Sequence, residues 1–94
     1  MKYDVAVIGG GVVGALISRE LSKYDVKAAV LERCNDIAMG TTKANSAIVH
    51  GGFDAVSGTV KAKLNVEGTA IMPKLCKELN VPYRNNGSLV VAFS

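Results

Sequence analysis

Three glycines near the amino terminus have the spacing of a phosphate-binding turn. Gly9, Gly11 and Gly14 give the pattern G-x-G-x-x-G within the sequence GGGVVG. The first glycine permits a tight turn, the second lets a pyrophosphate approach the backbone, and the third lets a helix pack close to a strand. The backbone N–H groups of Val12 and Val13 would then face the phosphates, and the helix dipole favours the same negative charge. The pattern predicts a dinucleotide-binding turn.

Glu32 is the next candidate, because it ends the second apolar run of the chain. A carboxylate at that place accepts two hydrogen bonds from a ribose diol, and its charge repels a 2′-phosphate. Arg33 beside it is a candidate for the adenosine end, with surface solvation as the alternative. Together with the glycine turn, these residues predict an adenine dinucleotide but do not distinguish NAD from FAD.

A polar, glycine-rich segment over residues 33–58 follows, and it is longer than a loop that only connects two elements in a compact domain. Its hydroxyls and amide can contact phosphates, and its paired glycines let the backbone approach a flat ring. Such a segment suits a long, extended cofactor and so favours FAD over NAD. The candidate contacts are Thr41, Thr42, Asn45, Ser46, His50, Gly51 and Gly52.

His50 is the single histidine of the chain and therefore a candidate general base. Its position in the cofactor loop favours a structural or cofactor-binding role over catalysis. These residues indicate no other catalytic candidate. Two isolated cysteines and one histidine make a metal site implausible.

The elements that must position these residues form an α/β unit. Short apolar runs predict parallel strands over residues 3–8 and 27–32, with an amphipathic helix over 12–24 between them, which is a Rossmann-like βαβ unit. We expect a helical turn near Thr42–Ser46 and a short strand near Ala47–His50. A second helix is predicted from Thr59 to about residue 80, kinked or broken at Pro73.

The last residues predict a hairpin-type turn at 85–87 and a strand over 88–93. We therefore divide the chain into a dinucleotide-binding part with its cofactor loop, residues 1–58, and a helix and strand leading toward a substrate domain, residues 59–94.

Composition excludes several classes of protein. The net charge of +3 is weak and scattered, and three Tyr, two Phe and no Trp offer little base-stacking surface, so nucleic-acid binding is not indicated. No apolar run is long enough to span a membrane. Cys34 and Cys76 lack a CxxC pattern, and we expect both to be reduced, with Cys76 a small core residue.

At this point the sequence resembles a known family. The motifs YDVAVIGGGVVG, LER, GTTKANSAIVHGG, VKAKLNVEG and GSLVVA are similar to the amino-terminal part of FAD-dependent oxidoreductases of the D-amino-acid-oxidase/glycerol-3-phosphate-dehydrogenase superfamily. The likeness is strongest to bacterial anaerobic-type glycerol-3-phosphate dehydrogenases and covers the whole chain. Where those enzymes often read Leu-Arg-Tyr after the glycine pair, this chain reads Phe53-Asp54-Ala55.

The resemblance implies positions along FAD for the residues above. Gly9, Gly11 and Gly14 would bind the pyrophosphate, and Glu32 the adenosine ribose with Arg33 adjacent. Thr41, Thr42, Asn45 and Ser46 would follow the phosphates and ribityl chain, and His50, Gly51 and Gly52 would lie near the isoalloxazine ring. It further implies oxidation of glycerol 3-phosphate to dihydroxyacetone phosphate by hydride transfer to FAD. The alternatives are a 2-hydroxy acid oxidoreductase of the 2-hydroxyglutarate type, a free-standing NAD-binding module, and a fragment without a ligand.

Relatives of this kind are several times longer, so we expect a fragment that is inactive alone and binds FAD poorly. Its unpaired strand edges predict self-association. For the parent protein we expect a small-molecule substrate and no nucleic acid, with a peripheral membrane or electron-acceptor subunit as a candidate partner. The expected location is the cytoplasm, with membrane association through partner subunits as the alternative.

Overall fold

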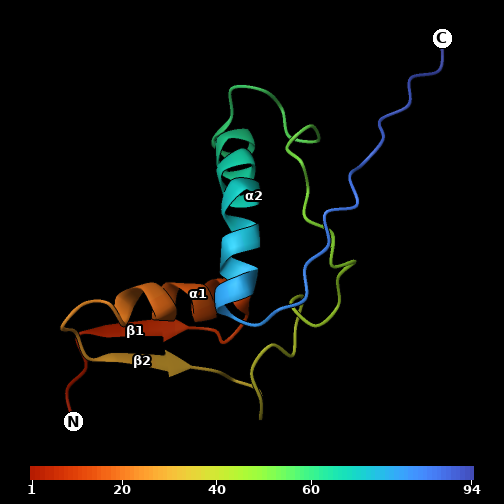
Figure 1. Ribbon diagram of the computed structural model, residues 1–94. Coiled ribbons are helices and arrows are strands. Elements are labelled where there is room, and N and C mark those ends of the chain that lie inside the picture. The colour runs from red at the N-terminus through yellow and green to blue at the C-terminus, as the bar shows by residue number, and fades with distance from the viewer. The chain divides into compact units, whose positions relative to one another are not determined.

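Two parallel strands joined through a helix form the amino-terminal unit of the computed structural model, which describes residues 1–94 (Figure 1). The chain divides into one unit of residues 1–46 and another of residues 47–94. In the first, strand β1 (Val5–Ile8) pairs in parallel with strand β2 (Ala28–Leu31), and helix α1 (Val12–Leu21) connects them. The predicted βαβ unit is therefore confirmed, with each element one to three residues shorter at its ends.

The two strands are in a register that aligns their carboxyl ends. Val5 lies opposite Ala28, and Ile8 lies opposite Leu31. Asp4 closes the amino-terminal end of the pair, because its carboxylate accepts the Lys27 N–H at 2.8 Å. At the other end the Gly9 N–H donates to the Leu31 carbonyl at 2.8 Å. As a result, the turn after β1 and the residues after β2 emerge side by side.

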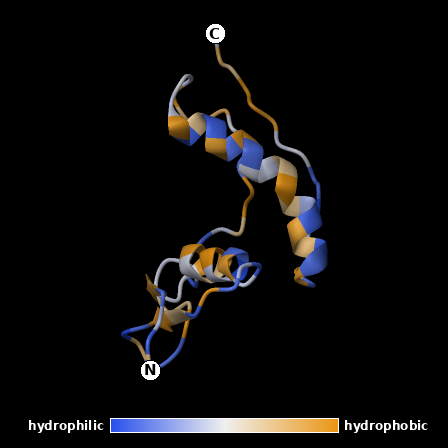
Figure 2. Cartoon of the chain, turned by 90° about the vertical axis from the view of Figure 1, so that its left-hand side faces the viewer, coloured by the Kyte–Doolittle hydropathy of each residue, from blue (hydrophilic) through white to orange (hydrophobic).

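The apolar residues of the first unit are only partly covered. Val7 is its one buried hydrophobic side chain, at 8% exposed, whereas Ile8 is 77% and Val13 69% exposed. Figure 2 shows hydrophobic residues on both strands and along one side of α1. Val13 and Ile17, two members of the predicted helical stripe, line an open cavity (below) and do not belong to a closed core.

Helix α2 (Val60–Glu78) is the regular element of the second unit. It begins at Thr59, whose hydroxyl accepts the Ala62 N–H at 3.2 Å and so caps the first turn. Val60, Leu64 and Ile71 on this helix and Leu79 at its carboxyl-terminal cap are exposed, but Cys76 is buried at 5% exposed, as expected of a small core residue. The two cysteines are both free, and Cys34 is exposed.

Pro73 lies inside α2, which continues through it, so of the two predicted outcomes, a kink or a break, the break is wrong. Proline cannot donate to the carbonyl four residues earlier, and the loss of one such bond is tolerated where the flanking turns remain intact. The axis of α2 curves along its length in Figure 2. The bend therefore takes the form of curvature within one continuous helix.

Three further expectations differ from the structure, and a fourth agrees with it in part. Residues 40–44 form a turn with bonds from Lys43 and Ala44 to carbonyls three residues earlier, about two residues before the helical turn expected near Thr42–Ser46. The expected strand at 47–50 is absent, as are the hairpin at 85–87 and the strand at 88–93. A strand needs a hydrogen-bonding partner, and no segment of residues 1–94 pairs with either stretch.

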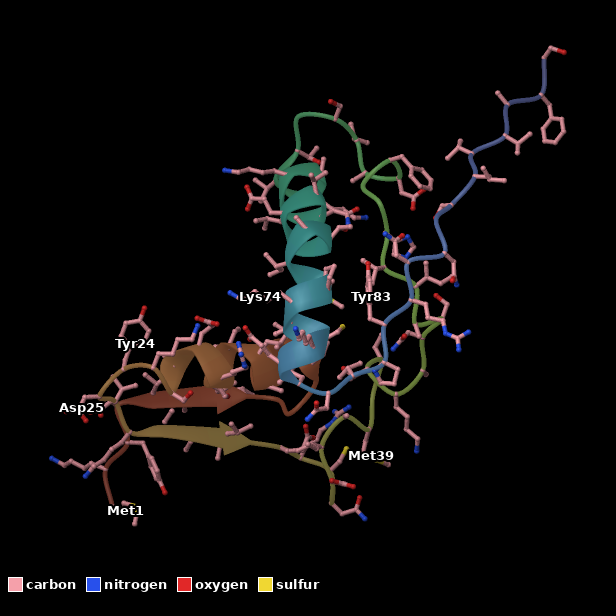
Figure 3. The ribbon with its side chains drawn as sticks, viewed as in Figure 1. Met1, Tyr24, Asp25, Met39, Lys74 and Tyr83 are labelled. Atoms are coloured by element: carbon pink, nitrogen blue, oxygen red, sulfur yellow. The ribbon has the colours of Figure 1, made fainter.

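Side chains in Figure 3 mark the ends of the first unit: Tyr24 and Asp25 lie at the turn between α1 and β2, and Met39 follows β2 in the loop. No helix of the structure combines the length and apolar character needed to cross a membrane.

Candidate functional site

A trough lies at the carboxyl ends of β1 and β2, where open α/β sheets bind their ligands. Its cavity volume is about 520 Å³. The trough brings together six of the predicted site residues from three separate segments, with five neighbours that the prediction did not include. The predicted residues are Gly9, Gly11, Glu32, Arg33, Thr41 and Thr42, and the additional ones are Ile8, Leu31, Cys34, Met39 and Gly40.

The glycine turn has the geometry that its sequence pattern predicts. Gly9 has a φ of +103°, a conformation that favours glycine. A Cβ on Gly14 would overlap the carbonyl oxygen of Gly9 and lie 3.3 Å from the side chain of Val7, so α1 packs against the turn and β1 only because this residue is glycine. A Cβ on Gly11 would fill the space 3.2 Å from the Thr42 hydroxyl. The cradle therefore fits the close approach of a pyrophosphate.

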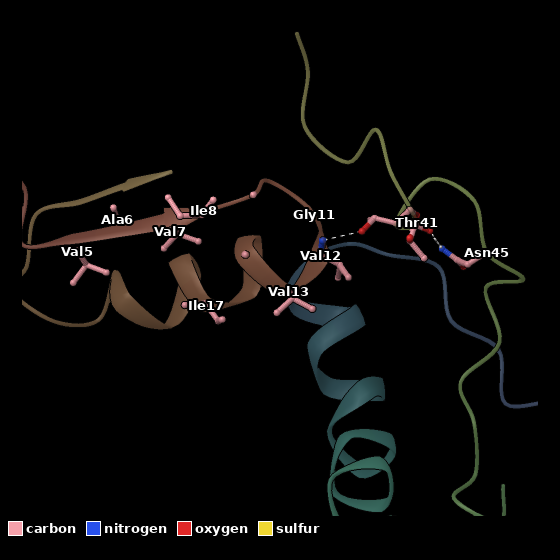
Figure 4. Close-up of a pocket in the computed structure, with 13 residues that line it drawn as sticks. Val5, Ala6, Val7, Ile8, Gly11, Val12, Val13, Ile17, Thr41 and Asn45 are labelled. Carbon is pink, nitrogen blue, oxygen red and sulfur yellow. Dashed lines mark hydrogen bonds between the residues drawn. The ribbon is translucent and has the colours of Figure 1, made fainter. Parts of the chain in front are cut away.

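The Thr42 hydroxyl reaches the first turn of α1 from the loop after β2. It accepts the Val12 N–H at 2.9 Å, which Figure 4 draws as a dashed line. Gly11, the residue before the helix, offers no side-chain cap of its own. Thr42 therefore supplies the cap from 30 residues further along the chain and fixes the loop beside the predicted phosphate site.

Glu32 braces the same turn through backbone hydrogen bonds. Its Oε2 accepts the Gly10 N–H at 2.7 Å, and its Oε1 accepts the Cys34 N–H at 2.9 Å. The N–H groups of Cys34 and Gly10 lower the pKa of Glu32, because they stabilise its charged form. Each carboxylate oxygen retains a second lone pair. The side chain can therefore hold the turn and still accept bonds from a ribose diol.

A second cavity of about 680 Å³ lies on the apolar side of the unit, between β1, α1 and the loop (Figure 4). Its lining includes the predicted residues Val12, Val13, Gly14 and Asn45. The Asn45 amide donates to the Thr42 carbonyl at 2.9 Å, and so supports the loop that carries the Thr42 hydroxyl. In the structure Asn45 therefore holds the loop, whereas Thr42 faces the trough.

The remaining loop candidates lie in the second unit, apart from Ser46 at the end of the first. His50 Nδ1 lies 3.1 Å from Asp54 Oδ2. The His50 carbonyl accepts from Asn65 Nδ2 at 2.9 Å and from the Thr69 hydroxyl at 2.5 Å. Gly52 has a φ of +108°, and a Cβ there would lie 2.7 Å from Val66.

Sequence reasoning missed Asp54, Asn65 and Thr69 as neighbours of His50. The spacing of four between Asn65 and Thr69 places them on one face of a helix, which is a signal that the sequence does contain. It missed Gly10 and Cys34 as partners of Glu32 because backbone N–H groups have no residue-type signature.

Comparison with known proteins gives a consistent result. The model of the family described as FAD dependent oxidoreductase matches residues 4–94. A glycerol 3-phosphate dehydrogenase from Caloramator mitchellensis is 55% identical over 97% of this chain and 19% of its own length. A mitochondrial L-2-hydroxyglutarate dehydrogenase from Dictyostelium discoideum is 40% identical over 96% of this chain and 21% of its own.

A glycerol 3-phosphate oxidase from Mycoplasma genitalium is 37% identical over 97% of this chain and 24% of its own length. The chain thus spans about a fifth of the length of the curated relatives it matches.

Proposed function

The chain belongs to the family of FAD-dependent oxidoreductases, and from this premise we propose that it is the FAD-binding segment of a dehydrogenase that oxidises glycerol 3-phosphate to dihydroxyacetone phosphate. FAD supplies the redox chemistry by accepting a hydride from the substrate carbon. The residues of this chain bind and orient the cofactor.

One observation carries the choice of substrate. Identity to the Caloramator glycerol 3-phosphate dehydrogenase is 55%, against 40% to the Dictyostelium L-2-hydroxyglutarate dehydrogenase over nearly the same residues. The two relatives act by name on different hydroxyl compounds, and the higher identity favours the phosphate ester.

The trough of the first unit supports the cofactor assignment. We assign the pyrophosphate to the turn of Gly9 and Gly11 and to the Val13 N–H at the start of α1, because the Val12 N–H donates to the Thr42 hydroxyl. We assign the adenosine ribose to Glu32. The Glu32 charge disfavours a 2′-phosphate at that place. Arg33 lines the same trough and could contact the adenosine end.

The other residues of the loop are assigned by resemblance. Thr41 and Thr42 line the trough beside the glycine turn, and with Asn45 and Ser46 we assign them to the phosphates and ribityl chain. We assign His50, Gly51 and Gly52 to the ring end of the cofactor.

A 2-hydroxy acid is the second candidate substrate. Six of the relatives found are L-2-hydroxyglutarate dehydrogenases, at 34–40% identity. Both substrates carry an anionic group and a secondary hydroxyl. The glycine turn and the trough are assigned to the cofactor, so they are compatible with either substrate.

The test uses the purified product of the complete reading frame. Flavin absorbance first establishes whether FAD co-purifies or binds on addition. The loaded protein is then mixed without oxygen with glycerol 3-phosphate or with L-2-hydroxyglutarate, and bleaching of the oxidised flavin band is followed. We expect faster bleaching with glycerol 3-phosphate. Faster bleaching with L-2-hydroxyglutarate establishes the second candidate, and no bleaching with either refutes both.

A further inference from the structure

The backbone of His50 is held by two side chains of α2. Asn65 Nδ2 donates to the His50 carbonyl at 2.9 Å, and the Thr69 hydroxyl donates to the same oxygen at 2.5 Å. The Thr69 hydroxyl also lies 2.9 Å from the Asn65 carbonyl, but its single hydrogen has the shorter contact with His50. Asn65 and Thr69 are both half-buried, one helical turn apart on α2. The polypeptide at His50 is therefore fixed to a regular element.

The chain after His50 is also constrained against α2. Gly52 has a φ of +108°, and a Cβ on it would lie only 2.7 Å from the Val66 side chain. Val66 directly follows Asn65 on α2. The backbone of the turn over residues 50–54 thus contacts the helix at two adjacent places, which holds the main chain that carries His50 and Asp54.

Asp54 determines which ring nitrogen of His50 carries the hydrogen. His50 Nδ1 lies 3.1 Å from Asp54 Oδ2, within hydrogen-bond distance. An ionised carboxylate only accepts hydrogen bonds, so the Nδ1 atom that faces it must be the donor. In a neutral imidazole the other nitrogen, Nε2, then carries a lone pair and accepts.

We propose that Asp54, Asn65 and Thr69 are positioning residues that present Nε2 of His50 as a fixed acceptor for a hydroxyl donor. The identity of that donor rests on the proposed function, which supplies an alcohol substrate. The positioning itself rests on the contacts within residues 50–69 alone. Both side chains of the His50–Asp54 pair are more than half exposed, so a ligand can reach the ring.

The first measurement is the tautomer of His50, read from the nitrogen chemical shifts of its ring by ¹⁵N NMR. It is made on the protein itself, at a pH well above the reference histidine pKa of about 6.5. His50 is the single histidine of residues 1–94, and a His50→Gln sample identifies its signals in any longer product. We expect Nδ1 protonated in the wild type and a shift of population toward Nε2 protonation in Asp54→Ala.

Two variants act as controls in the NMR measurement. Asp25→Ala removes the same charge from the turn after α1 and should leave the tautomer unchanged. Asp54→Asn keeps an oxygen acceptor at residue 54 and should retain much of the wild-type tautomer. A wild-type ring protonated mainly at Nε2, or an Asp54→Ala ring identical to the wild type, overturns the proposal.

The second measurement uses steady-state kinetics of the product of the complete reading frame. Loss of one oriented hydrogen bond should lower kcat/KM of Asp54→Ala for the better of the two substrates by about threefold to tenfold, with partial rescue in Asp54→Asn. Unchanged kcat/KM despite a shifted tautomer overturns the positioning role. If neither substrate reduces the flavin, the proposed function fails, while the NMR measurement still decides whether Asp54 sets the tautomer.

Discussion

Replacement of Gly14 by alanine tests whether helix α1 owes its position to the missing side chain. The added Cβ would overlap the Gly9 carbonyl oxygen, well inside the 3.0 Å that real Cβ atoms keep, and would lie 3.3 Å from the Val7 side chain. The first of these neighbours is backbone, which cannot rotate away. The start of α1 must therefore separate from the turn by on the order of 1 Å, as overpacked sites do.

Two opposing contributions determine the expected size of the effect. Alanine is favoured over glycine in a helix interior by about 1 kcal/mol, whereas overpacking of this kind costs about 3 kcal/mol at its upper range. We therefore expect Gly14→Ala to lower the free energy of unfolding by about 2 kcal/mol. If the N–H groups at the start of α1 bind the pyrophosphate as proposed, the shift also misaligns them, and loss of one charge-assisted bond should lower FAD affinity about tenfold to a hundredfold.

Gly68→Ala is the matched control. Gly68 lies inside α2, and a Cβ there would meet nothing within 4 Å. Replacement of Gly68 by alanine should therefore raise the free energy of unfolding by up to about 1 kcal/mol through helix propensity alone, and FAD affinity should be unchanged. Urea unfolding followed by circular dichroism measures the first quantity, and FAD titration of the product of the complete reading frame measures the second.

The reasoning is refuted if Gly14→Ala is as stable as the wild type and binds FAD with the same affinity. Destabilisation of both glycine variants by similar amounts would also contradict it, because the explanation requires opposite signs at the two sites.

Three further predictions concern the loops. The pKa of Glu32 is lowered in the folded state, so its contribution to stability is fully present above the unfolded pKa near 4.5 and is lost as pH falls through the folded pKa. In urea unfolding between pH 7 and pH 3, Glu32→Gln should therefore lose less stability on acidification than the wild type. Thr42→Val removes the acceptor for the Val12 N–H and should cost about 1 kcal/mol in urea unfolding, and an unchanged unfolding midpoint would contradict the capping role. Gly52→Ala should lower the free energy of unfolding by about 1–3 kcal/mol, because residue 52 has a positive φ. Adding Val66→Ala to that variant should restore only the part of the loss that comes from overlap with the Val66 side chain.

Much of the first unit could be predicted because its signals are local. The alternation of a short apolar run, a glycine turn and a helical stripe predicted β1, α1 and β2 in the correct order, with ends that differ by up to three residues. Glycine positions specify backbone geometry within a few residues, as the φ of +103° at Gly9 illustrates.

The errors share a physical cause. Residues 88–93 have the composition of a strand, but strand formation requires a partner with which to exchange hydrogen bonds, and none of residues 1–94 provides one. Pro73 carries a strong local signal for a helix break, yet the intact turns on either side carry α2 through it. The strand depended on a partner elsewhere in the chain, and the helix on the turns that flank Pro73.

The sequence by itself determined the tight glycine turn after β1 and the α/β order of the first elements, because those depend on residue types within one turn or one strand. Only the tertiary structure decided which distant groups complete the site. Thr42 caps α1 from 30 residues away, Glu32 holds the N–H of Gly10, and Thr69 fixes the backbone of His50. Such pairings depend on the path of the chain between the residues, and no local preference encodes that path.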